Sequence, residues 1–194
     1  YGFRKYLNWH DLAVLNTFSV EKEQFREFLL KNSEQYEFEE KLNTDKEIDI
    51  ISSMETSWES QFSISRSNNY LKWRLADIPY DKYYILLIRL KGKIVAGIVY
   101  KFFYEDIDIL EVFAYDLVIK NEVLGAGVNH LFKSTEPRIN IWSNLYSEEH
   151  LLLEKLGFKE TDFNTYFGII PFKVNSPLLN YKLWHYRFID SDVY

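Results

Sequence analysis

The chain has 194 residues, of which 47% are hydrophobic and 18% aromatic, and its formal net charge is −6. This length suits one domain, or one domain with an appendage, and allows a buried core without disulfides. The absence of cysteine excludes a disulfide framework, a thiol nucleophile and a cysteine-based metal site, and the acidic balance disfavours bulk nucleic-acid binding. Because no apolar run could span a membrane and no signal-peptide pattern is present, we expect a cytoplasmic protein with no membrane or nucleic-acid partner.

Residues 1–60 predict an N-terminal helical appendage. Ser19 can cap a helix from residue 20 to about residue 31, and Thr44-Asp-Lys-Glu47 matches a capping box that opens a second helix over about 45–57. The only methionine is at position 54, so we do not expect the chain to begin at its native start. The appendage is either a helical extension or the tail of a preceding, related domain.

Residues 61–194 predict a single domain of mixed strands and helices. Apolar runs at 83–90 and 93–103 are separated only by Lys91-Gly92, which is typical of a tight turn between strands. A third apolar run follows. Helical patterns at 123–133 and from 147 to Gly157 flank a short strand at 139–142, and later strands are expected near 158, 166–172 and 183–189. This alternation predicts an α+β or α/β fold with a sheet of mixed direction.

This order of elements resembles the GNAT acyltransferase superfamily over residues 61–194. The matching pieces are Gly92-Lys-Ile-Val-Ala-Gly97, the segment 122–127 and the stretch 153–158. The resemblance implies a three-layer α+β fold with a mixed, mostly antiparallel sheet, helices on both faces and a splay between the central strands that admits an acyl-CoA.

A narrower resemblance comes from the two ends of this domain. Tyr70-Leu-Lys-Trp-Arg74 precedes a proline, and the chain closes on Asp190-Ser-Asp192. Both features look like bacterial GNAT proteins linked to polysaccharide biosynthesis, some of which carry two such domains in tandem. A tandem GNAT domain or a homodimer is therefore a possible partner of this domain.

The resemblance implies acetyl-CoA as the acyl-donor substrate. The superfamily holds the CoA pyrophosphate on backbone N–H groups of a glycine loop at a helix N-terminus, and the glycines of segment 122–127 match that loop. Glu122 departs from the family pattern, which has Arg or Gln there. Backbone N–H groups of the preceding strand usually supply the oxyanion donor. The implied donor-binding residues are Val112, Phe113, Ala114, Gly125, Ala126 and Gly127.

The implied reaction, attack of an amine on a thioester, needs a base for the amine and an acid for the departing thiolate. Glu111 lies in an apolar strand, where burial would raise its pKa, and Asp116 lies at the end of that strand. Either one is a candidate base, or else an ordinary solvated or turn residue. Many family members have a tyrosine that acts as the general acid at the position of Leu153, so here that role is either vacant or filled by a nearby group such as Tyr146 or Tyr115.

The sequence gives weaker evidence for a catalytic histidine or a metal site. His150 and His185 are possible bases by their ordinary pKa, but if Trp184 and Tyr186 point inward along a strand, alternation predicts that His185 points outward. No His, Asp or Glu cluster has the spacing of metal ligands, so no metal is expected.

Three functions are compatible with the sequence. The first is an acetyl-CoA-dependent N-acyltransferase that acts on a small amine, such as an amino sugar in surface-polysaccharide biosynthesis. The second is a catalytically degenerate GNAT-fold module that binds a ligand or partner. The third is a relative of the aminoacyl-tRNA-dependent transferases, which the negative charge disfavours.

Overall fold

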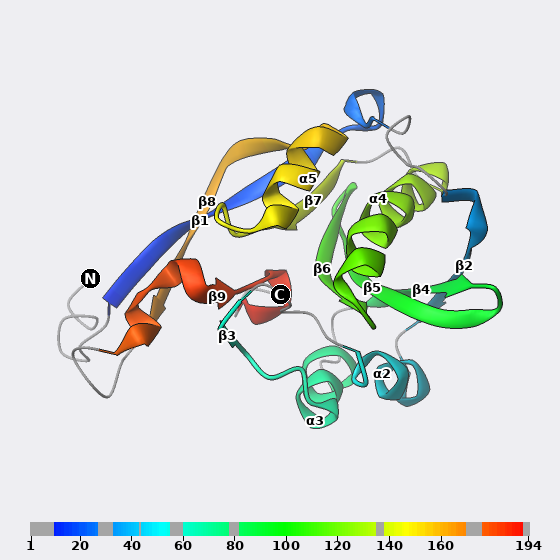
Figure 1. Cartoon of the computed structure of the whole chain (residues 1–194), viewed down its shortest axis with the longest axis horizontal. Coiled ribbons are helices and arrows are strands. Elements are labelled where there is room, and N and C mark those ends of the chain that lie inside the picture. Colours follow the sequence, from blue (N-terminus) through cyan, green and yellow to red (C-terminus); the bar gives the residue numbers. More distant parts are fainter. Residues whose placement is uncertain are drawn as a thin grey trace.

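A mixed sheet runs through the molecule in the strand order β2-β4-β5-β6-β7-β1-β8, and β3 and β9 form a separate pair (Figure 1). The computed structural model describes residues 10–26, 33–42, 44–54, 60–77, 82–134, 138–169 and 176–191. The strands are β1 (His10–Val20), β2 (Tyr36–Leu42), β3 (Phe62–Ser63), β4 (Tyr84–Leu90), β5 (Lys93–Phe103), β6 (Asp106–Ala114), β7 (Ile139–Trp142), β8 (Lys159–Ile169) and β9 (Trp184–His185). Within the described part of the large sheet, β6 and β7 are parallel and the other neighbours are antiparallel. The predicted mixed, mostly antiparallel sheet is confirmed.

Helices cover both faces of this sheet (Figure 1). They are α2 (Asp45–Ile51), α3 (Asn68–Leu71) with its π-helical continuation η4 (Lys72–Ala76), α4 (Leu117–Ser134) and α5 (Glu148–Leu156), with short 3₁₀ turns η1 (Lys22–Gln24), η3 (Ser33–Gln35), η5 (Pro177–Leu179), η6 (Tyr181–Leu183) and η7 (Phe188–Asp190). One core cluster joins α4 and α5 to the sheet. A second joins α2, α3 and the C-terminal segment to the opposite face. Among the described residues no helix has the length and apolarity needed to cross a membrane.

Several strands and helices begin or end at the residues that local sequence signals predict. Lys91 and Gly92 both have positive φ, 52° and 74°, as a two-residue turn between antiparallel strands requires. The Ser147 hydroxyl accepts the His150 N–H at the start of α5, and Gly157 closes that helix at φ 102°. These positions need only neighbouring residues to define them, which is why the sequence finds them.

The helical character predicted for residues 1–60 is wrong for two described stretches. Residues 10–20 form β1, which lies between β7 and β8, and residues 36–42 form β2, which pairs with β4 at the sheet edge. The helix predicted from Val20 is absent over residues 20–26, and residues 27–31 lie outside the described part. Phe18 and Val20 alternate into the core beneath α5 and α4, so burial in the sheet overrides the local capping signal. The second predicted helix, over about 45–57, is confirmed from Asp45 as α2, but it ends at Ile51, and residues 55–57 lie outside the described part.

The sheet separates where β6 and β7 meet. These strands pair at three positions, from Ile107↔Ile139 to Ile109↔Ile141, and β6 then continues to Ala114 without β7 beside it. A β-bulge interrupts the pairing of β6 with β5 between the partners of Tyr100 and Val99. It leaves Leu110 unmatched and turns Glu111 toward the face away from α4. The predicted splay between the central strands is therefore present, and Glu111 lies in it.

Candidate functional site

Glu111 is the centre of a buried charge cluster in the splay. Its side chain is fully buried, and its Oε2 accepts two hydrogen bonds from Arg66, from Nε at 3.0 Å and from Nη2 at 2.9 Å. The Nε2 of His185 lies 3.1 Å and 3.2 Å from the two carboxylate oxygens, and the Val112 N–H donates to Oε1 at 3.0 Å. Both oxygens of Glu111 are thus engaged by strong donors.

A second buried carboxylate extends the cluster toward α4 and α5. Glu149, in the first turn of α5, accepts a bidentate pair of hydrogen bonds from Arg187, and the Lys120 Nζ lies 3.3 Å from its Oε2. Arg187 also donates to the carbonyl of Trp142 at 2.5 Å, at the end of β7, and its Nε lies 3.5 Å from Glu111. The guanidinium of Arg187 therefore occupies the gap that opens where β7 leaves β6.

The C-terminal turn η7 closes the cluster. Asp190 binds Arg66 through both carboxylate oxygens, at 2.6 Å and 2.8 Å, and also accepts the backbone N–H of Arg187 at 2.9 Å. Three carboxylates, on Glu111, Glu149 and Asp190, are matched by three cations, on Arg66, Arg187 and Lys120. This balance makes the cluster close to neutral, as buried charges require.

The protonation states follow from this arrangement. Burial by itself would raise the pKa of Glu111, as the sequence predicted, but the hydrogen bond from His185 and the charges of Arg66 and Arg187 outweigh it and hold the pKa well below its usual range. Burial also opposes ionisation of Glu149, yet Arg187 and Lys120 lower its pKa to about 2. For His185, burial lowers the pKa below the usual value, against the attraction of Glu111. Both carboxylates are therefore ionised at neutral pH, and His185 is neutral.

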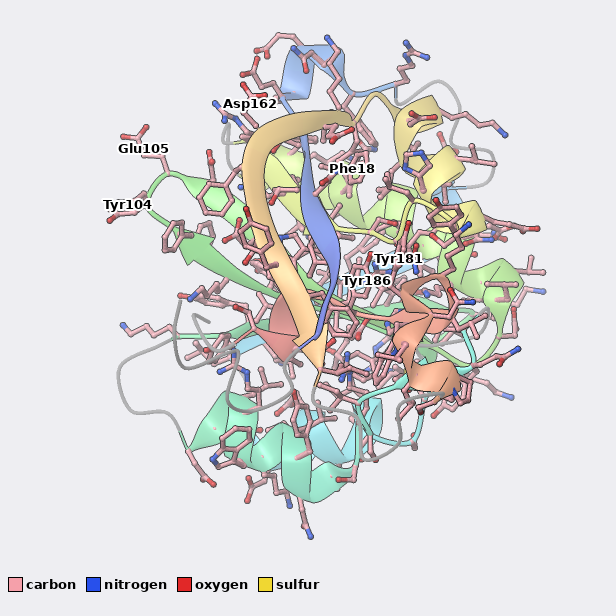
Figure 2. The ribbon with its side chains drawn as sticks, turned by 90° about the vertical axis from the view of Figure 1, so that its left-hand side faces the viewer. Phe18, Tyr104, Glu105, Asp162, Tyr181 and Tyr186 are labelled. Carbon is pink, nitrogen blue, oxygen red and sulfur yellow. The ribbon has the colours of Figure 1, made fainter. Side chains whose placement is uncertain are left out.

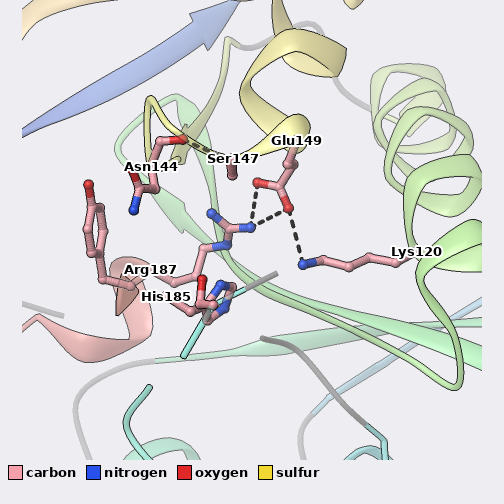
Figure 3. A pocket seen from close by; sticks show the side chains of 8 residues that line it. Lys120, Asn144, Ser147, Glu149, His185 and Arg187 are labelled. Carbon is pink, nitrogen blue, oxygen red and sulfur yellow. Dashed lines mark hydrogen bonds and ion pairs between the residues drawn. The ribbon is translucent and has the colours of Figure 1, made fainter. Parts of the chain in front are cut away.

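A small pocket, with a cavity volume of about 20 Å³, lies beside this cluster (Figure 3). Figure 3 shows Lys120 and Arg187 converging on Glu149 from opposite sides, with His185 below them. The lining side chains are those of Ser60, Lys120, Asn144, Ser147, Glu149, His185, Tyr186 and Arg187. The pocket therefore presents charged and hydrogen-bonding groups, and most of them already bind one another.

The predicted pyrophosphate loop is not a loop. Gly125, Ala126 and Gly127 lie in the middle of α4, which begins eight residues earlier, at Leu117. A Cβ on Gly127 would come within 2.3 Å of the Ile98 Cδ1, so this glycine lets the helix pack closely on β5. Glu122 is also helical and accepts a hydrogen bond from the Tyr36 hydroxyl at 2.5 Å.

The other predicted site residues are dispersed. Asp116 caps α4, since its carboxylate accepts the Ile119 N–H at 2.8 Å, so the turn-or-cap interpretation describes its contacts. Tyr146 is half exposed, outside the residues that line the pocket, and accepts a hydrogen bond from the Tyr181 hydroxyl at 3.1 Å that lowers its pKa. Of the three candidate catalytic residues, Glu111 lies in the buried charge cluster, and Asp116 and Tyr146 lie outside it.

The remaining predicted donor-binding residues lie on β6. Val112, Phe113 and Ala114 are fully buried and paired with β5, opposite Ile98, Gly97 and Ala96. The Val112 N–H, a predicted oxyanion donor, is taken by the Glu111 carboxylate. These three residues thus form the wall of the splay.

His185 was placed wrongly by strand alternation. The predicted strand 183–189 is reduced to β9, which pairs with β3, and then turns into η7. His185 is consequently buried with Tyr186 instead of pointing outward. The sequence signal that could have found this cluster is the set of basic residues in aromatic surroundings, at Arg66, Arg74 and Arg187, since buried arginines need carboxylates.

Acetyl-CoA does not fit this arrangement. The start of α4 already carries the Asp116 carboxylate, an anion where a pyrophosphate would need bare N–H groups. The gap between β6 and β7 is filled by Arg187, bound to the Trp142 carbonyl. Among the described residues, no group of three or more His, Asp and Glu side chains could hold a metal ion.

Comparisons with solved structures identify the fold. No protein-family model matches the sequence, and no curated protein matches it. Solved structures do match. A probable N-acyltransferase from Enterococcus faecalis aligns with a TM-score of 0.61 at 11% identity, over 87% of this chain and 42% of its own.

Two further structures are GCN5-related N-acetyltransferases. The one from Anabaena variabilis has a TM-score of 0.57 at 11% identity, over 86% of this chain and 42% of its own. The one from Kribbella flavida has a TM-score of 0.52 at 9% identity, over 82% of this chain and 59% of its own. The chain therefore has the GNAT fold, and it spans between 42% and 59% of the length of these three proteins.

Proposed function

We propose that this chain is a GNAT-fold module that binds a ligand or partner without taking an acyl group from acetyl-CoA. The observation that carries the proposal is the position of the C-terminal segment 184–191, which fills the β6–β7 splay with His185 and Arg187. The cleft that serves acyl-CoA binding in this fold is used here for internal contacts.

The energy of those contacts supports the proposal. Withdrawing Arg187 from the splay would leave Glu149 with Lys120 as its remaining cation, and would expose the Trp142 carbonyl. Breaking a buried ion pair by removing one partner costs roughly 3–5 kcal/mol. A ligand that needed this opening would lose roughly a hundredfold to a few thousandfold in apparent affinity.

Thermal unfolding with acetyl-CoA and with free CoA tests the proposal. A ligand present at 100 times its Kd stabilises a protein by about 2.7 kcal/mol, which for a chain of this size corresponds to a rise in Tm of roughly 5–10 °C. We expect no shift at millimolar acetyl-CoA. A shift of that size that disappears when Gly127 or Asp116 is substituted would overturn the proposal.

A second candidate function is N-acyl transfer to a small amine such as an amino sugar. The observation that favours it is the His185–Glu111 contact, because a neutral histidine held by a carboxylate beside a pocket can take a proton from an amine. In this alternative Glu111 is a positioning residue, and the acyl donor reaches the pocket by a path other than the splay.

An activity assay separates the two candidates. The chain is incubated with acetyl-CoA and a panel of amines that includes glucosamine, and the release of free thiol is followed. The matched pair of variants is His185→Ala and His130→Ala, because His130 lies on α4 and contacts Phe38 and Glu40 instead of the cluster. Turnover that is lost in His185→Ala and survives in His130→Ala would favour the transferase. No turnover above the uncatalysed rate in the wild type favours the binding module.

A further inference from the structure

A second pocket lies at the other end of the β6–β7 pairing, on the face of the sheet opposite α4 and α5. Its empty volume, including the open mouth, is about 560 Å³. Its lining comes from strands β5, β6, β7, β1 and β8, from the residue before β7 and from η7. The lining residues are Thr17, Ser19, Phe103, Asp106, Asp108, Arg138, Asn140, Thr161, Phe163 and Phe188.

Strand alternation explains why this face is polar. Thr17 and Ser19 are two residues apart on β1, and Asp106 and Asp108 are two residues apart on β6, so each pair points to one face of the sheet. The residues between and beside them, such as Phe18, point to the opposite face and into the core with α4 and α5. β1 and β6, which flank β7, thus place hydroxyls and carboxylates on the same face of the sheet, on either side of Asn140.

Asn140 links these polar groups into one network. Its amide N–H₂ donates to Asp108 at 2.8 Å and to Asp106 at 3.3 Å, while its carbonyl oxygen accepts the Ser19 hydroxyl at 2.5 Å. Asp108 is only 1% exposed, and Lys101 stands directly opposite it on β5. The floor of the pocket is therefore pre-organised, and its carboxylate charge is partly offset.

Aromatic rings form the walls of the pocket. Phe103 and Phe163 are 43% and 65% exposed, an unusual state for large apolar rings beside a polar floor. Phe188, which stacks on Trp142 with ring centroids 4.6 Å apart, lies at the base. In Figure 2 the β5–β6 turn, marked by Tyr104 and Glu105, and the bend of β8 at Asp162 project on the same side of the molecule, and the residues next to them carry the two exposed rings.

We propose that this pocket binds a neutral saccharide. A sugar ring presents an apolar face that packs against aromatic rings, and a set of vicinal hydroxyls that donate to carboxylates and accept from amide and guanidinium groups. The pocket supplies the rings on Phe103 and Phe163, the carboxylate on Asp106, and a guanidinium at its rim on Arg138. The inference does not rest on the proposed function, because the two pockets lie at opposite ends of β6.

Other ligand classes match the lining less well. A phosphate or sulfate would meet the carboxylates of Asp106 and Asp108. A simple ammonium would gain from those carboxylates, but Lys101 stands opposite Asp108 and Arg138 is at the rim. A purely apolar ligand would cover the polar groups of the Asn140 network without forming hydrogen bonds to them, which is unfavourable. A neutral hydroxylated ring can contact both the aromatic walls and the polar floor of the pocket.

Ligand-observed NMR and calorimetry on the full chain test the proposal. The probes are methyl glucoside, methyl galactoside, N-acetylglucosamine and, as an amine without hydroxyls, cyclohexylamine. We expect at least one saccharide to bind, and Phe163→Ala and Asp106→Asn each to weaken it by roughly tenfold or more, since a hydrogen bond to a charged group and the burial of a ring each contribute that much.

Matched controls come from the same turn and strand. Tyr166→Ala removes a ring on β8 that is 63% exposed and outside the lining, and Glu105→Gln removes a carboxylate in the β5–β6 turn. Both should retain wild-type affinity, and the circular dichroism of all four variants should be unchanged. The proposal is overturned if no saccharide binds at concentrations on the order of tens of millimolar, if cyclohexylamine binds and the saccharides do not, or if Phe163→Ala and Asp106→Asn leave saccharide binding intact.

Discussion

Replacing Glu111 by glutamine removes the charge at the centre of the buried cluster while keeping the shape of the side chain. Arg66 would keep Asp190 and Arg187 would keep Glu149, but both would lose a carboxylate, at 2.9 Å and 3.5 Å respectively. Such a loss costs roughly 3–5 kcal/mol, which corresponds to a fall in Tm of roughly 6–20 °C for a chain of this size.

The assay is urea unfolding combined with calorimetry of Glu111→Gln and of a matched control, Glu39→Gln. Glu39 is also a strand carboxylate with two cations, Lys41 at 2.8 Å and Arg89 at 3.1 Å, but it lies at the surface. We expect the control to melt close to the wild type because exposed ion pairs contribute little. If Glu111→Gln also melts close to the wild type, with an unchanged m-value, the argument that the cluster locks the C-terminal segment into the splay is refuted.

Three further outcomes follow from the contacts described. The pKa of Glu149 is lowered from 4.5 to about 2 on folding, so its contribution to stability is complete above pH 4.5 and is lost as the pH falls toward 2. The free energy of unfolding should therefore depend less on pH between 4.5 and 2 in Glu149→Gln than in the wild type. Burial lowers the pKa of His185, so its imidazole resonances should report a neutral ring at pH 7 and begin to shift below pH 6.5. Because the histidine of the unfolded chain binds a proton more readily, the protein should become less stable as the pH falls through 6.5. Gly157→Ala should destabilise the chain by more than about 1 kcal/mol in chemical denaturation, because φ is 102° and the new Cβ would lie 2.2 Å from the Gln24 carbonyl oxygen; a neutral effect would show that the end of α5 relaxes freely.

The predicted elements that proved right are those defined by neighbouring residues. The hairpin at Lys91-Gly92, the cap at Ser147 and the helix end at Gly157 each depend on the backbone conformation of a few consecutive residues. The apolar runs of β4, β5 and β6 identify buried strands because the sheet is covered on both faces. From these elements in order, the sequence was sufficient to predict the GNAT fold and its splay.

The errors concern segments whose state depends on distant partners. β1 is a strand because it fills the position between β7 and β8, more than 100 residues later in the sequence. Position 127 is a glycine because α4 approaches Ile98 closely, a requirement that the glycine motif alone cannot reveal. In each case a tertiary contact outweighs a local preference of about 1 kcal/mol or less.

The sequence by itself determined part of the scaffold: the central strands β4 to β7, the ends of α5 and the presence of Glu111 in one of those strands. Tertiary structure decided what occupies the splay, because Glu111 meets Arg66, His185 and Arg187 across separations of 45 to 76 residues. A buried charge is stable where opposite charges and donors surround it, and no local pattern encodes which distant segment will supply them.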